Sequence, residues 1–184
     1  MKGKFNKIVF IVLCVFLLVG CDKTQTAIMD GKEYVFDKEF KEFYATYKMP
    51  NDFRLLETGN QYEDNNNKVF ELYDKEANVL YRVSVKKVSL GLSTQPMKDD
   101  AKAIEDNKNN TITDAKNETY NNINWAVVKY KTTTDDFGKN TIVDTYYGLY
   151  SDAGINMYYK IEFMGTEESS EFEQAFLNSF KMNN

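Results

Sequence analysis

Two cysteines supply the only thiols in this sequence, and the second stands in a specific context. Three lysines precede an uncharged apolar run from Ile8 to Val19, and Gly20 then leads directly into Cys21. A membrane-spanning helix needs about 20 apolar residues, so a run this short is typical of the hydrophobic region of a secretory signal. The pattern predicts cleavage between Gly20 and Cys21, with the Cys21 sulfur as the atom that is modified.

The small residue before Cys21 resembles the lipobox of bacterial lipoproteins, in which the cysteine sulfur receives a diacylglyceryl group before the signal is removed. The resemblance implies a palmitate-type lipid anchor on the extracytoplasmic face of the cell membrane. One acyl chain alone binds a bilayer only marginally, at about 0.8 kcal/mol for each buried CH2, so the two chains on Cys21 would make the attachment stable. The alternative is an uncleaved signal anchor.

The sequence lacks the residues and motifs of several common catalytic sites. The sequence contains no histidine, which removes serine–histidine and cysteine–histidine nucleophile pairs and the usual zinc sites. It has no P-loop and no GxGxxG motif. The pairs Asp99-Asp100 and Asp135-Asp136 are the remaining candidates for acid–base work or calcium, but a first helical turn and a loop turn explain them more simply. We therefore predict no catalytic residue, no metal site, no cofactor and no enzyme activity.

Removal of the signal defines the domain organisation. We expect residues 1–20 to be a lipoprotein signal peptide, residues 21–33 a lipidated cysteine with a polar tether, and residues 34–184 a single globular α+β domain. Loss of three lysines with the signal changes the formal net charge from −5 to −8. An acidic domain without a basic stripe repels phosphate backbones, so no nucleic-acid partner is expected.

The period of the apolar residues predicts the order β-β-β-α-β-β-β-α. The three strands before the first helix are expected at Phe43–Met49, Val69–Tyr73 and Val79–Val88, with a polar loop at Tyr62–Lys68. The helix begins near Pro96, and the next three strands follow at Ile123–Lys131, Thr141–Tyr150 and Ile155–Met164. Because Ile123–Lys131 is apolar on both faces, we expect it inside the sheet.

The last helix has a visible start and an apolar stripe. Ser170 and Glu173 have the spacing of a capping box, in which each side chain satisfies a backbone amide of the first turn. Phe172, Phe176 and Phe180 then recur on one face. Three phenylalanines on one stripe predict that the helix is docked against the sheet.

Tyrosines crowd the predicted hairpin between Thr141 and Met164. Neighbouring Tyr146 and Tyr147 must point to opposite faces of the strand, so one hypothesis is an exposed aromatic face that binds a protein, a glycan or a lipid. The candidate residues are Tyr146, Tyr147, Tyr150 and Tyr158. The alternative is a structural role, because tyrosine favours strands and pairs across them.

This arrangement is similar to the PsbP-like α-β-α sandwich, as seen in small lipoproteins of Gram-positive bacteria. The resemblance rests on the strand that ends in Tyr47-Lys48-Met49-Pro50-Asn51-Asp52-Phe53, on the hairpin, helix and long hairpin that follow, and on the closing segment Phe176-Leu177-Asn178-Ser179-Phe180. It covers roughly residues 33 to 182 and implies an antiparallel sheet covered by helices. It also implies a binding or assembly factor, although fold alone does not fix function.

The sequence therefore favours a membrane-anchored binding or assembly module whose partner is a protein or another envelope component. One alternative is a carrier of a lipid or small hydrophobic ligand, which the aromatic content would suit. Another is a cell-wall hydrolase that works with carboxylates alone.

Overall fold

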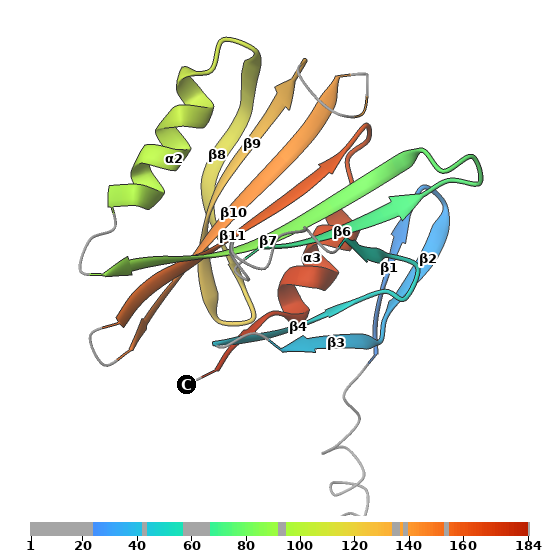
Figure 1. Cartoon of the computed structure of the whole chain (residues 1–184), viewed down its shortest axis with the longest axis horizontal. Helices are drawn as coiled ribbons and strands as arrows, with labels where there is room; N and C mark the ends of the chain where they lie inside the picture. Colours follow the sequence, from blue (N-terminus) through green and yellow to red (C-terminus); the bar gives the residue numbers. More distant parts are fainter. Residues whose placement is uncertain are drawn as a thin grey trace, which may run out of the picture.

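A seven-stranded antiparallel sheet forms the body of the protein (Figure 1). The computed structural model describes residues 24–41, 44–56, 67–91, 95–133, 137, 140–152 and 155–183. In the order β5-β6-β7-β11-β10-β9-β8, the sheet contains β5 (Arg54–Leu56), β6 (Asn67–Tyr73), β7 (Val79–Gly91), β8 (Asn110–Tyr120), β9 (Ile123–Thr132), β10 (Thr141–Asp152) and β11 (Ile155–Gly165).

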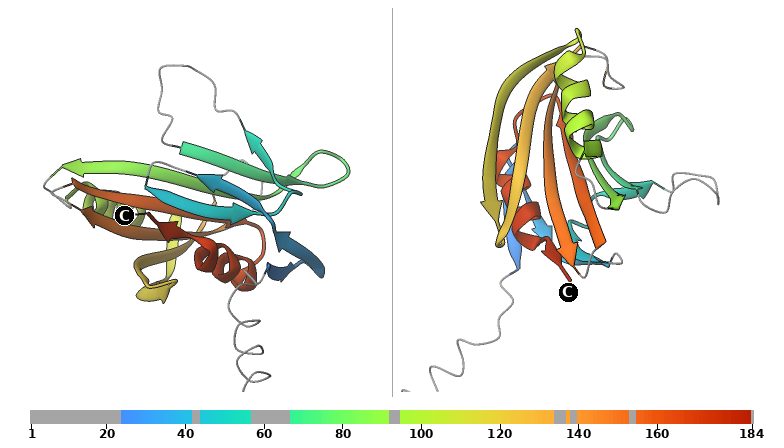
Figure 2. Two further views of the ribbon diagram at one scale, coloured as in Figure 1. Left: turned by 90° about the horizontal axis from the view of Figure 1, so that it is seen from below. Right: turned by 90° about the vertical axis from the view of Figure 1, so that its left-hand side faces the viewer.

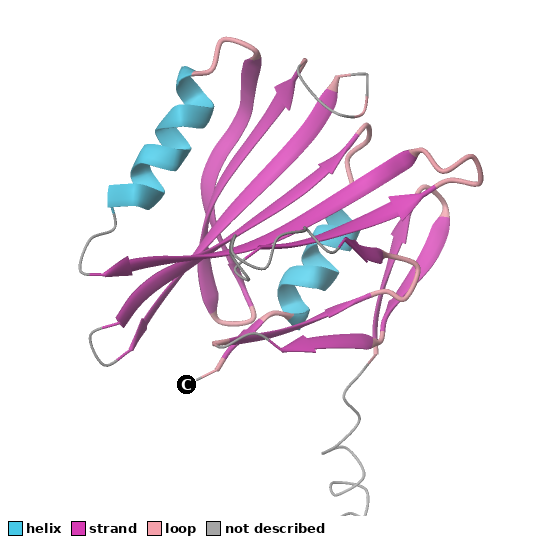
Figure 3. Ribbon diagram, in the orientation of Figure 1, coloured by secondary structure: helices cyan, strands magenta, loops and turns pink. Residues whose placement is uncertain are grey.

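Two helices cover opposite faces of this sheet (Figures 2 and 3). Helix α2 (Gln95–Asp106) places Ile104 against Val128 and Tyr158 on one face. Helix α3 (Ser170–Ser179) packs into the larger apolar cluster on the other. The α+β architecture of an antiparallel sheet covered by helices, predicted from apolar periodicity, is confirmed. Neither helix of the described residues has the length and apolar character needed to cross a bilayer.

Two small β units share the α3 face of the sheet. Strands β1 (Gln25–Met29) and β2 (Lys32–Phe36) pair as a hairpin, and β3 (Lys38–Lys41), β4 (Ala45–Met49) and β12 (Lys181–Met182) form a three-stranded sheet. The hairpin buries Ala27, Tyr34 and Phe36 in the main core. The polar tether predicted over residues 21–33 is therefore wrong from Gln25 onward, because packing of these side chains holds the segment in the domain. The predicted signal and Cys21 lie outside the described residues.

Strands with strict apolar alternation lie where the sequence predicts them. The buried residues of β4 are Ala45, Tyr47 and Met49, while Phe43 lies outside the described residues. Strands β7, β10 and β11 contain the predicted segments, and β9 pairs with a strand on each side, so it is an interior strand as expected.

Strand β8 was not predicted. Eight of its eleven residues are polar, and none of the eleven is fully buried. It lies at the edge of the sheet beside β9, where one side of the backbone ladder has no partner strand and charged side chains are favourable. The predicted polar loop at Tyr62–Lys68 also needs correction, because Asn67 and Lys68 belong to β6, while residues 62–66 lie outside the described residues.

Close packing against Trp125 explains why residue 148 in β10 is a glycine. Gly148 of β10 lies opposite Trp125 of β9, whose side chain is fully buried. A Cβ atom at position 148 would lie 2.6 Å from the indole ring. The absence of a side chain at Gly148 therefore lets the tryptophan lie flat on the sheet beneath the C-terminal Phe180, whose ring centroid is 5.4 Å away.

Helix α3 is docked through the predicted phenylalanine stripe. Phe172, Phe176 and Phe180 are fully buried. The Phe176 ring lies 5.5 Å from the ring of Tyr47 on β4 and 5.5 Å from that of Phe163 on β11, measured between centroids. The helix therefore joins the small sheet to the large one.

Candidate functional site

Strand β8 presents a row of charged side chains on the sheet face that α3 covers. Lys116 and Glu118 lie opposite core residues of β9, and side chains paired in this way share a face. The Lys116 Nζ atom lies 2.9 Å from both Asp114 Oδ2 and Glu118 Oε1. The Tyr120 hydroxyl donates to Glu118 Oε2 at 2.8 Å. The row is therefore held together by its own ion pairs and hydrogen bonds.

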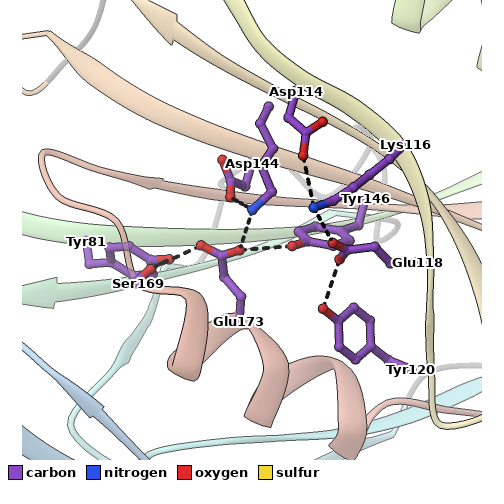
Figure 4. Close-up of polar contacts among 10 residues, drawn as sticks. Tyr81, Asp114, Lys116, Glu118, Tyr120, Asp144, Tyr146, Ser169 and Glu173 are labelled. Carbon is purple, nitrogen blue, oxygen red and sulfur yellow. Dashed lines mark hydrogen bonds and ion pairs between the residues drawn. The ribbon is translucent and has the colours of Figure 1, made fainter.

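Beside this row, three charged side chains from three elements meet in a more buried cluster (Figure 4). Lys129 of β9 forms an ion pair with Asp144 Oδ2 of β10, and its Nζ atom lies 3.5 Å from Glu173 Oε2 of α3. The Tyr146 hydroxyl donates to the same Glu173 oxygen at 3.0 Å, and the Ser169 hydroxyl donates to the other at 3.3 Å. Two carboxylates thus share one ammonium group inside the protein.

The surroundings of these groups shift their pKa values. Burial raises the pKa of Glu173 to about 7, the charge of Asp144 acts in the same direction, and Lys129 opposes both. Burial by itself would lower the pKa of Lys129, but its hydrogen bond to Asp144 and the charge of Glu173 raise it overall. Burial and the Glu173 carboxylate also hold the pKa of Tyr146 well above its usual range, so this phenol stays protonated and remains a donor.

The Glu173 pKa predicts that folding stability falls as the pH rises. The folded chain binds the Glu173 proton more tightly than the unfolded chain does, so stability decreases between the ordinary value of 4.5 and about 7. This interval corresponds to about 3 kcal/mol. The Glu173→Gln variant keeps the shape of the side chain without its charge. Urea unfolding should find it more stable than the parent at pH 8, by up to about 3 kcal/mol, with the difference closing towards pH 5.

Glu105→Gln is a matched control, because Glu105 is exposed on α2, across the sheet from the cluster. Its stability should follow that of the parent at both pH values. A Glu173→Gln difference that stays constant between pH 5 and pH 8 would contradict the assignment of this titration to Glu173.

A groove of about 310 Å³ opens above the cluster, between strands β8 to β10 and the segment that enters α3. Its charged lining residues are Asp114, Lys116, Lys129, Lys131, Asp144 and Glu168. The Asp144 side chain is only 9% exposed, and its Oδ1 atom is buried away from Lys129. The Glu173 carboxyl lies beside it, and a hydrogen bond between the two acids helps to raise the pKa of Glu173, so protonated Glu173 supplies the donor that a buried acceptor needs.

A second hollow lies on the opposite face, between α2 and the sheet. Its volume is about 380 Å³, and Arg82 and Asp100 are among its charged lining residues. Both side chains are paired within the protein, Arg82 with Glu71 at 2.6 Å and Asp100 with Lys160 at 2.9 Å. The groove beside α3 has six charged side chains in its lining and is therefore the stronger candidate for binding a polar ligand.

Comparison with known proteins identifies the fold. No protein-family model and no curated protein sequence matches this chain. LpqN of Mycobacterium tuberculosis, described as involved in cell envelope biogenesis, superimposes with a TM-score of 0.59 at 9% identity over 76% of this chain and 83% of LpqN. The cyanobacterial PsbP (CyanoP) of Synechocystis sp. PCC 6803 has a TM-score of 0.50 at 12% identity over 90% of this chain and 99% of CyanoP. The fold is PsbP-like.

In this PsbP-like fold the predicted tyrosine face is not a surface. Tyr146, Tyr147, Tyr150 and Tyr158 are all buried. Tyr146 and Tyr147 do point to opposite faces of β10, but Tyr146 contacts α3 while the Tyr147 hydroxyl donates to Asp100 of α2 at 2.7 Å. The hypothesis of an exposed aromatic binding face is therefore wrong, because the sheet is covered on both sides.

The predicted carboxylate pairs do not form a site in the described residues. Helix α2 begins at Gln95 and has no acid in its first turn, so the helix-dipole explanation of Asp99-Asp100 is wrong. The Asp99 carboxylate accepts a hydrogen bond from the Gln95 amide at 2.6 Å, while Asp100 binds Tyr147 and Lys160 and so fastens α2 to the sheet. Asp135-Asp136 lies outside the described residues.

The capping box at the start of α3 is also wrong. The N-cap residue is Ser169, and no side chain caps the helix; the Glu173 amide donates to the Ser169 carbonyl at 3.0 Å. The carboxylate of Glu173 turns into the sheet instead, where Tyr146 and Lys129 bind it. The Tyr81 hydroxyl is hydrogen-bonded to that of Ser169, which completes the chain of contacts in Figure 4.

The sequence analysis did not identify Lys129 or Asp144, and it gave Glu173 only a role in helix capping. One signal was available for the two strand residues, since each occupies a core-facing position of an otherwise apolar alternation, next to Val127 and Tyr146 respectively. A charged residue at such a position is rare unless it is paired. In the described part of the chain, no cluster of three or more acidic, cysteine or histidine side chains is arranged to hold a metal ion.

Proposed function

We propose that this protein is a lipid-anchored, extracytoplasmic lipoprotein that binds an envelope component through the groove beside α3, without catalysing a reaction. The observation that carries the proposal is the lining of the groove, in which five other charged side chains accompany Asp144. Rigid β-strands hold this residue and its neighbours, as is expected of a preformed binding site.

The sequence and the comparisons support an envelope location. The apolar run that ends in Gly20 and Cys21 supplies the anchor, with the cell membrane as the first partner. The fold shared with LpqN, a protein described as involved in cell envelope biogenesis, agrees with this location. The absence of histidine from the sequence supports a binding role over acid–base or nucleophilic catalysis.

The packing of the aromatic residues favours this function over that of a carrier of hydrophobic ligands. The rings of Phe172, Phe176, Tyr47 and Trp125 pack against one another in the core instead of lining an open cavity. The groove beside α3 has a lining dominated by charged side chains. A polar ligand suits such a lining better than an apolar one, because burying unpaired charges under an apolar ligand is costly.

The anchor is tested by cell fractionation of the Cys21→Ala variant. We expect the parent protein in the membrane fraction, labelled by palmitate, and the variant outside that fraction, because no lipid holds it. Cys14→Ala is the matched control, because this cysteine lies within the signal and its replacement should change neither result. A Cys21→Ala variant that remains in the membrane, with an unlabelled parent, would contradict the anchor.

Binding through the groove is tested by capture from solubilised envelope with the mature protein. We expect an envelope component that the parent retains and Asp144→Asn loses. Asp106→Asn serves as the control, since Asp106 lies exposed on α2, across the sheet. Recovery of the same components with all three proteins would contradict a role for the groove.

A further inference from the structure

A short stretch of chain separates the predicted lipid from the folded domain. Strand β1 begins at Gln25, four residues after Cys21. An extended chain spans at most about 3.6 Å per residue, so Gln25 lies within about 14 Å of Cys21. The β1–β2 hairpin is itself packed into the core through Ala27, Tyr34 and Phe36, so it adds nothing to this reach. A lipid on Cys21 therefore holds the end of the domain that contains Gln25 close to the bilayer.

The small sheet of β3, β4 and β12 lies at this end of the domain. Figure 1 shows β3, β4 and the C-terminus along the lower edge of the molecule, where β1 also begins. Gln25 is close to the sheet, because it lines a hollow of about 90 Å³ together with Lys48 of β4 and Lys181 of β12. An anchor at Cys21 therefore places the small sheet next to the lipid headgroups.

The outward face of the small sheet is basic. The buried residues of β4 alternate with Thr46 and Lys48, which point outward. Residues opposite these two in the ladder share their face. This surface, called the basic face below, consists of Glu39, Lys41, Thr46, Lys48 and Lys181. Lys41 pairs with Glu39 at 3.2 Å, and three lysines against one acid leave a formal excess of two positive charges.

The basic face contrasts with the rest of the mature chain. The formal net charge of that chain is −8, and the basic face has three of its lysines but only one of its acids, so the remainder is more acidic still. An anionic bilayer attracts this face and repels the others. Each lysine close to such a surface favours the contact by about fivefold.

We propose that the basic face lies on the anionic headgroups of the bilayer that holds the Cys21 lipid, and that this contact fixes the orientation of the domain. The contact rests on the proposed function, because the lipid brings the face to the bilayer. A bilayer suits this face better than a small ligand does. The lysines are spread over three strands, and the hollow between them is smaller than the about 300 Å³ of a small-molecule site.

This orientation leaves the groove beside α3 open. The basic face lies at the C-terminal end of the helix, where Asn178 and Ser179 line the hollow. Ser170, at the N-terminal end, lines the groove instead. The ten residues of α3 span about 15 Å, so an envelope component can enter the groove while the domain stays on the bilayer.

The test measures the height of single fluorescent labels above the bilayer, with the lipidated mature protein in vesicles. Cys21 is its only cysteine and carries the lipid, so Asn178→Cys and Asn109→Cys each create one labelling site. Asn178 is exposed beside the basic face. Asn109 is exposed at the far end of β8, about 35 Å along the strand from the turn in which the Asn121 amide donates to the Phe180 carbonyl at 2.6 Å.

Energy transfer to an acceptor on the headgroups should depend on the charge of the lipid. In vesicles of equal parts phosphatidylglycerol and phosphatidylcholine, we expect strong transfer from residue 178 and weak transfer from residue 109. The difference should shrink in pure phosphatidylcholine and in about 1 M salt, where the Debye length falls to about 3 Å. A short link alone gives the same transfer under all three conditions. That result would assign the basic face to a partner other than the bilayer and overturn the proposal.

Charge variants locate the contact on the basic face. The readout is the salt concentration at which transfer from residue 178 falls halfway. Lys41→Gln with Lys181→Gln should weaken the contact about 25-fold and lower that concentration, while Lys75→Gln with Lys102→Gln, both exposed elsewhere, should leave it unchanged. Glu39→Gln should strengthen the contact about fivefold and raise it, a gain that misfolding cannot produce. Unchanged values for both variants of the basic face would overturn the site.

The bilayer contact and the proposed function are decided separately. A palmitate-labelled parent whose residue 178 responds neither to lipid charge nor to salt would reject the contact and leave the anchor and the groove in place. The expected response without groove-dependent capture of an envelope component would reject the role of the groove alone. A parent that carries no lipid would reject both the anchor and the contact.

Discussion

Replacement of Phe176 by aspartate should leave the domain unfolded at room temperature. The Phe176 side chain is fully buried between Tyr47, Phe163 and Phe180. Truncation of such a ring costs about 3 to 5 kcal/mol, and an unpaired buried carboxylate adds several more. Because domains are stable by only about 5 to 15 kcal/mol in total, little or no folded protein should remain. Circular dichroism and the thermal midpoint measure this directly.

Gln174→Asp is the matched control on the same helix. Gln174 is exposed two residues earlier, so the same new charge meets water there, and the stability should change by no more than about 0.5 kcal/mol. An unchanged thermal midpoint for Phe176→Asp would contradict the docking of α3, on which the geometry of the groove depends.

The sequence predicted the parts of the fold that have strong apolar periodicity. The alternation in β7, β10 and β11, and the phenylalanine stripe of α3, arise because one face of each element is buried, and burial selects apolar residues at a fixed spacing. The same reasoning failed for β8 and for the β1–β2 hairpin. These elements bury few side chains, so their residues reflect the polar surroundings of an edge more than their backbone conformation.

The candidate site was beyond the reach of local patterns for a different reason. Lys129 and Asp144 are 15 residues apart and Glu173 is a further 29 residues along the chain, so only the pairing of β9 with β10 and the docking of α3 bring them together. Glu173 has the spacing of a capping residue, but burial of Phe172 and Phe176 on either side turns its carboxylate towards the sheet. Tertiary packing decides whether Glu173 caps the helix or joins the buried cluster, and the spacing of a capping motif contains no information about that packing.

Lys129 should be the most important charged residue for stability at neutral and alkaline pH. It is the only ammonium group bound to both Asp144 and Glu173 among the described contacts, and both acids are more than nine-tenths buried. Removing one partner of a buried ion pair leaves an uncompensated charge and costs about 3 to 5 kcal/mol. We expect this loss for Lys129→Met in urea unfolding at pH 8. At pH 5 the loss should be smaller, because Glu173 is then protonated.

Two further variants separate lost charge pairing from lost packing. Lys131→Met makes the same substitution at an exposed position of the same strand, β9, and should change the free energy of unfolding by no more than about 0.5 kcal/mol. In the Lys129→Met background, Glu173 has lost the ammonium group that lowers its pKa, so Glu173→Gln should restore at least about 3 kcal/mol at pH 8. A double variant that is no more stable than Lys129→Met, or a Lys129→Met protein within about 1 kcal/mol of the parent at pH 8, would show that the two acids do not depend on this lysine. The shared ammonium group would then not be what keeps two buried carboxylates next to each other in the sheet.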